Sequence, residues 1–136
     1  MNASLAIWGA LLDFAASVIV WTRPHSTIPA ATVGGTIFID PQLTASETKC
    51  ALMHELIHLE LGHGGCQPAS VEREVQLMAA RRLVTFEDLQ RVAGWSRNPS
   101  EMAEELGVTE QVVMDRIATL DGDQIQALWP PSDHIA

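Results

Sequence analysis

Apolar residues follow a strand-like pattern in the first third of this chain and a helix-like pattern in the rest. Two short apolar runs, "SVIVW" (17–21) and "TIFID" (36–40), predict buried strands. An apolar segment over residues 3–15 predicts a short helix before them. Residues 22–35 contain prolines and a Gly-Gly pair, which predict a loop between the strands. The first third therefore predicts a helix and a small sheet.

A long helix is predicted over residues 45–62. It begins with a capping-box pattern, in which the Thr44 side chain accepts from the amide three residues on while Glu47 reaches back. A run of glycines ends the helix. Further helices are predicted to begin at Ser70 and Thr85, and two or three short helices follow them.

These elements favour one domain of the α+β class, with helices packed on a small β-sheet. The length of 136 residues is that of a single domain. We expect residues 1–98 to form its core, with the sheet and the long helix, and residues 99–136 to form a helical part packed on that core.

Charge composition disfavours nucleic acid as a partner. The net charge is −9, with one lysine and seven arginines, whereas affinity for nucleic acid comes from basic side chains that neutralise phosphates. The two cysteines do not form a disulfide framework and fit a reducing cytoplasm. The apolar first 21 residues lack a positively charged start and include Asp13, so we expect neither a signal peptide nor a membrane span.

The segment "CALMHELIHLELGH", residues 50–63, carries the strongest chemical signal. At about 100° per residue, His54 and His58 lie one turn apart on one face of the helix, so both imidazoles can reach one metal ion. Glu55 flanks this face, where its carboxylate can contact a metal-bound water without binding the metal. This HExxH pattern is typical of zinc hydrolases, and the alternative is a pair of hydrogen-bonded histidines without a metal.

A zinc site needs a third protein ligand, and the next helix offers Glu72 and Glu74. The two lie about 160° apart on the helical wheel, so at most one can face the histidines. Glu74 shares its side with three apolar residues, which we interpret as the packed face, and a carboxylate there needs a compensating cation. We therefore expect Glu74 to be the third ligand. The alternatives are that Glu72 is the ligand instead, or that Glu74 forms an ion pair with Arg81 or Arg82 and binds no metal.

His63 and the two cysteines are weaker candidates. If the helix continues to His63, this side chain points away from the other histidines, so we interpret it as a residue that ends the helix. Cys50 lies one turn before His54, and Cys66 lies in the glycine-rich loop. Either thiol could approach the metal, but a fourth protein ligand would make the site structural instead of catalytic.

The consecutive segments "HELIHLELGH" and "EREVQLMAARRLV" resemble the signature of the ImmA/IrrE family of small phage and bacterial zinc metallopeptidases. The likeness covers roughly residues 36–120, and it departs from the family pattern at three packing positions: Val75, Gln76 and Met78. The resemblance implies Zn²⁺ as the cofactor and Glu74 as its third ligand. It also implies a cytoplasmic protease that removes or inactivates a phage or mobile-element repressor.

Two hypotheses of function follow. The first is a zinc-dependent endopeptidase in which His54, His58 and Glu74 hold the metal and Glu55 is the general base. The second is a zinc-stabilised protein-interaction module without peptidase activity. For the first, the chain has no tyrosine to stabilise an oxyanion, and the remaining candidates are Arg23, His25, His63 and His134.

The segment "PSEMAEELGVTEQVVMDRI" has the spacing of a helix-turn-helix but the wrong charge. From Glu101 to the end the chain contains eight acidic residues and one arginine, so phosphates would repel these helices. We expect them to pack on the core or to dock a basic protein such as a DNA-binding repressor, without direct contact to nucleic acid. The sequence makes no prediction of the oligomeric state.

Overall fold

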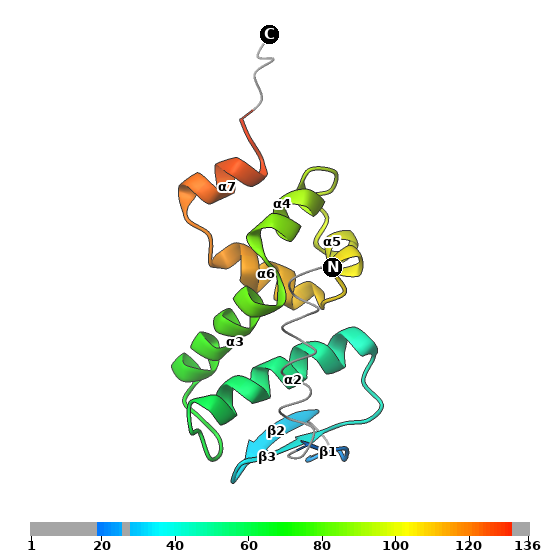
Figure 1. Ribbon diagram of the computed structural model, residues 1–136, viewed down its shortest axis with the longest axis vertical. Coiled ribbons are helices and arrows are strands. Elements are labelled where there is room, and N and C mark those ends of the chain that lie inside the picture. Colours follow the sequence, from blue (N-terminus) through cyan, green and yellow to red (C-terminus); the bar gives the residue numbers. More distant parts are fainter. Residues whose placement is uncertain (1–18, 26–27, 132–136) are drawn as a thin grey trace.

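The computed structural model describes residues 19–25 and 28–131, where six helices and a three-stranded sheet form one α+β domain (Figure 1). The predicted fold class is therefore confirmed. In chain order the elements are β1 (Ile19–Val20), β2 (Ala30–Val33), β3 (Thr36–Ile39), α2 (Ala45–Glu60), α3 (Ala69–Leu83), α4 (Phe86–Ala93), α5 (Pro99–Leu106), α6 (Glu110–Ala118) and α7 (Gly122–Leu128). The helix predicted over residues 3–15 lies outside the described residues. Among the described helices none has the length and apolar character needed to cross a membrane.

The sheet has the order β1-β3-β2, so β2 lies at an edge. Strand β1 is parallel to β3, whereas β2 pairs with β3 antiparallel through a two-residue turn. The turn residues Gly34 and Gly35 have φ angles of 56° and 84°, which a residue without a Cβ adopts at little cost. Strand β2 corrects the sequence analysis, which predicted a loop over residues 22–35. The prolines and small side chains there hid the strand, although a Gly-Gly pair is itself a hairpin signal.

Helix α2 lies between the sheet and the remaining helices (Figure 1). The predicted capping box is confirmed: Thr44 Oγ1 accepts from the Glu47 amide at 3.1 Å, and Glu47 Oε1 accepts from the Thr44 amide at 2.9 Å. One side of α2 packs on the sheet through Leu52 and Leu56, in a small core with Ile37. Its other side contributes to a second and larger core, so α2 is covered on two faces.

The larger core joins α2 to helices α3–α7 and includes residues from position 50 to position 128. Helix α3 contacts α2 and α6, and small side chains occupy much of its buried face. Arg73 Nη1 donates to Asp115 Oδ1 at 2.6 Å and links α3 to α6. Asp115 is buried against α3, where this contact with Arg73 compensates its charge. The division of the chain at residue 98 stays a prediction.

Stability is expected to depend strongly on the side of α2 that faces the larger core. Ile57 is fully buried there, so Ile57→Ala should lower the free energy of unfolding by about 2–5 kcal/mol through lost contacts and a cavity. Urea unfolding followed by circular dichroism measures this change. Leu61→Ala is the matched control, because Leu61 is 49% exposed just beyond the helix and should change stability by about 0.5 kcal/mol or less. Equal effects of the two substitutions would contradict the described packing.

Candidate metal centre

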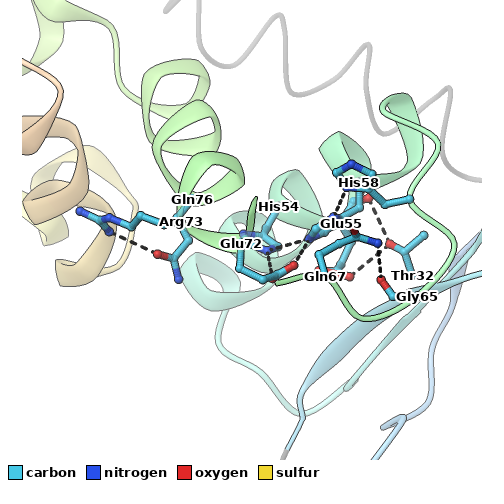
Figure 2. A network of polar contacts seen from close by, with 10 residues as sticks. Thr32, His54, Glu55, His58, Gly65, Gln67, Glu72, Arg73 and Gln76 are labelled. Carbon is cyan, nitrogen blue, oxygen red and sulfur yellow. Dashed lines mark hydrogen bonds and ion pairs between the residues drawn. The ribbon is translucent and has the colours of Figure 1, made fainter. Parts of the chain in front are cut away.

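Three side chains from two helices converge on one point beside the sheet. His54 and His58 come from α2 and Glu72 from the first turn of α3, and one donor atom of each lies within 4.8 Å of the others. His58 Nε2 is 2.6 Å from Glu72 Oε1, and His54 Nε2 is 3.2 Å from Glu72 Oε2. Figure 2 shows Glu72 reaching from α3 toward both imidazoles. Two imidazole nitrogens and one carboxylate form a donor set that suits zinc and leaves a coordination position open.

Glu72 occupies the place that the sequence analysis assigned to Glu74. Glu74 is exposed and is not part of the cluster of potential ligands among the described residues, so the expectation of Glu74 is corrected to Glu72. The reason lies in the packed face of α3, whose buried residues are Val75, Ala79, Ala80 and Leu83. On the helical wheel Glu72 falls on this face, whereas Glu74 lies about 160° from Glu72.

The signal that could have identified Glu72 is the run of small residues on α3. Val75 and Ala79 follow Glu72 by three and seven positions, which puts all three on one stripe. Small side chains there allow the backbones of α2 and α3 to approach closely. The larger Leu77 and Met78 are only partly buried, so side-chain size indicates the wrong face of α3.

Glu55 is held beside this centre by the edge strand. Glu55 is 7% exposed, and Thr32 Oγ1 lies 3.1 Å from Glu55 Oε1 and 3.1 Å from the Glu55 carbonyl oxygen (Figure 2). Burial raises the pKa of the Glu55 carboxyl above its ordinary value, while the neighbouring His54 and the Thr32 hydrogen bond act in the opposite direction. A carboxylate with a raised pKa is suited to accept and release a proton.

His58 is the more deeply buried of the two cluster histidines. Burial lowers the pKa of its imidazole below the ordinary value, although the Glu72 carboxylate acts in the opposite direction. The neutral imidazole that burial favours is the form that binds metals. His58 Nδ1, the nitrogen on the other side of the ring, lies 2.9 Å from His63 Nδ1.

Neither cysteine belongs to the cluster of potential ligands. Cys50 is buried in the larger core, where burial raises the pKa of its thiol above the ordinary value. Cys66 is exposed in the loop between α2 and α3. Within the described residues the donor set therefore stays at three, which is the open arrangement of a catalytic site.

A cavity of about 370 Å³ opens beside the centre, and Glu55, His58 and Glu72 line it. Its other walls are Ile28, strand β2 and the loop residues Gly65–Gln67. Of the four expected oxyanion-stabilising residues, His134 lies outside the described residues and the other three do not line this cavity. Gln67 does line it, with its side-chain amide donating to the Gly65 carbonyl at 3.1 Å, and the sequence analysis missed this residue.

Comparison with known proteins agrees with this geometry. Residues 16–118 match the model of the IrrE N-terminal-like domain, a peptidase family, which confirms the resemblance seen in the sequence. Searches of curated proteins and of solved structures find no match. The matched segment includes the three cluster residues, Glu55 and Thr32.

Proposed function

The chain belongs to the family of IrrE N-terminal-like peptidase domains, and on that premise we propose that it is a zinc-dependent endopeptidase. In this proposal His54, His58 and Glu72 hold the metal and Glu55 transfers the proton. The observation that carries it is the convergence of these three donor groups within 4.8 Å, with Glu55 lining the cavity beside them. Bound zinc supplies Lewis acidity, which acidifies water and polarises a carbonyl.

The protein's own groups perform the rest of the reaction. Glu55 accepts a proton from the attacking water and then delivers it to the leaving amine. Thr32 limits the rotation of the Glu55 carboxylate through its hydrogen bond, so that the carboxylate stays directed at the cavity. Gln67 is the residue from which we expect a side-chain hydrogen bond to the carbonyl under attack, because its amide lines the same cavity.

The outer edge of β2, which pairs with no other strand among the described residues, supports an extended polypeptide as the substrate. Val33 pairs with Thr36 across the two-residue turn, and the Asp40 amide donates to the Pro29 carbonyl at 2.8 Å. Because hydrogen-bonded and non-hydrogen-bonded pairs alternate in an antiparallel ladder, the main-chain groups of Thr32 point away from β3, toward the outer edge of β2. A peptide strand added there would lie along the cavity beside Glu55.

The proposed physiological substrate is a regulatory protein in the cytoplasm, namely a DNA-binding repressor. The family resemblance suggests this class, and the acidic charge of the chain suits a basic partner. Exposed acidic side chains on α5 and at the start of α6 offer a surface for it, namely Glu101, Glu104, Glu105 and Glu110.

Peptide hydrolysis and its metal dependence test the proposal. We expect the zinc-loaded protein to cleave a proteome-derived peptide mixture, or a repressor encoded by a neighbouring gene, at sites identified by mass spectrometry. Removing zinc with a chelator should abolish cleavage, and adding zinc back should restore it. A protein that binds zinc but cleaves neither the mixture nor the repressor would overturn the endopeptidase proposal and favour the interaction module.

A further inference from the structure

Helix α2 ends in a turn that brings the chain back to its second histidine. The Gly62 amide donates to the Leu59 carbonyl at 3.2 Å, and the His63 amide donates to the His58 carbonyl at 2.9 Å. Gly62 has φ +74°, the left-handed conformation that favours glycine. These features define a Schellman motif, in which the residue after the left-handed glycine lies beside the residue that begins the last turn. In this chain those two residues are His63 and His58.

The Schellman motif normally places an apolar contact between these two positions. Here two imidazoles meet instead, with His58 Nδ1 2.9 Å from His63 Nδ1 and the ring centroids 5.1 Å apart. His58 Nε2 faces the other way, toward Glu72 and His54. The two nitrogens of His58 are therefore divided between the cluster and His63.

This division determines which nitrogen of each ring carries hydrogen. A His58 ring that binds a metal through Nε2 keeps its hydrogen on Nδ1, so Nδ1 is a donor. His63 Nδ1 must then accept, with the His63 hydrogen on Nε2. A hydrogen bond to the distal nitrogen of a metal-binding histidine fixes its tautomer and ring orientation and raises its basicity.

We propose that His63 is a positioning residue for the metal centre, which holds His58 with Nε2 directed at the metal through a hydrogen bond accepted from His58 Nδ1. This inference rests on the proposed metal site and adds to it a residue that is not itself a ligand. It also gives a role to Gly62, because only the reversal of the chain at this glycine brings His63 back to the ring.

Two variants of similar size separate this role from simple packing. In His63→Asn the side-chain carbonyl can take the accepting position, whereas His63→Leu keeps an apolar contact and removes the acceptor. We expect the zinc dissociation constant to rise about 10–100-fold in His63→Leu and to stay within about threefold of the wild type in His63→Asn. Zinc affinity is measured by competition with a chromophoric chelator.

Cobalt substitution adds a readout of ligand geometry. The visible absorption of bound Co²⁺ should be the same in wild type and His63→Asn and changed in His63→Leu. Thermal unfolding of the metal-free proteins shows whether both variants remain folded. The inference would be overturned if His63→Leu kept the zinc affinity and the cobalt spectrum of the wild type. It would also be overturned if His63→Leu and His63→Asn lost zinc affinity equally. Absence of metal binding by the wild type would instead overturn the proposed function itself.

Discussion

Replacing Glu72 by alanine is expected to remove zinc from the protein, whereas replacing Glu74 by alanine is expected to leave it bound. The Glu72 carboxylate lies 2.6 Å from His58 Nε2 and 3.2 Å from His54 Nε2, so it is the cluster's one anionic donor among the described residues. Its loss leaves two imidazoles, which are too few for a stable zinc site in a protein. We expect about one zinc ion per chain in the wild type and in Glu74→Ala, and substantially less in Glu72→Ala.

Metal analysis of the purified proteins measures this difference directly. The two variants are closely matched, because the same side chain is removed at positions two residues apart on α3. Added zinc should also raise the unfolding temperature of the wild type and Glu74→Ala but not of Glu72→Ala, since a ligand stabilises only the state that binds it. Zinc retained by Glu72→Ala and lost from Glu74→Ala would contradict the described orientation of α3.

The parts of the site that lie within one helix were predictable from sequence. The spacing of His54 and His58 follows from helical geometry alone, and the Thr44–Glu47 capping box correctly marked where α2 begins. Helix α4 likewise begins after Thr85, whose side chain accepts from the Asp88 amide. Each of these features depends on residues only a few positions apart, so local rules are sufficient.

The parts that depend on contacts between elements were not predictable in the same way. Choosing between Glu72 and Glu74 requires knowing which face of α3 packs on α2, and the large apolar residues indicated the wrong face. Close packing selected small side chains such as Ala79 and Ala80 instead. The predicted start of α3 also differs by one residue, because the helix begins at Ala69, directly after Pro68, and not at Ser70.

The contact of His63 with His58 and the contact of Thr32 with Glu55 were not predicted, for related reasons. A helix that continued to His63 would place this side chain opposite the other histidines, but the chain reverses at Gly62 after the helix ends. Thr32 belongs to a strand that proline and small residues concealed, and its partner Glu55 is 23 residues away in sequence. Both residues contact the site through their position in space, which periodicity along the chain does not report.

The position of the site follows from the two cores that meet at α2. Leu52 and Leu56 belong to the core beside the sheet, whereas Met53 and Ile57 belong to the core beside the helices. His54, Glu55 and His58 lie among these residues on α2, where β2 and α3 can both reach them. A helix that is packed against a core on each of two faces is held rigidly, so the donor side chains along it keep the spacing that one metal ion requires.

Replacing Glu55 by glutamine is expected to abolish peptide hydrolysis while leaving zinc bound. Glu55 lines the cavity but is not one of the three converging donors, so the metal does not depend on it. Glutamine keeps the size of the side chain and an oxygen that can accept from Thr32, but it cannot take a proton from water. The substitution therefore removes proton transfer with little change in packing.

The expected magnitude follows from the usual contribution of a general base. We expect kcat/KM on a cleaved peptide to fall about 10²–10⁴-fold in Glu55→Gln, with zinc content and unfolding temperature close to those of the wild type. Single-site kinetics by mass spectrometry and metal analysis of the same preparation measure both quantities. Activity and zinc content are measured separately, so the two results together identify the role of Glu55. Lost activity with retained zinc assigns proton transfer to Glu55, whereas retained activity would assign it to another group. Lost zinc would mean that Glu55 supports the metal, and the division of roles between Glu55 and Glu72 would be wrong.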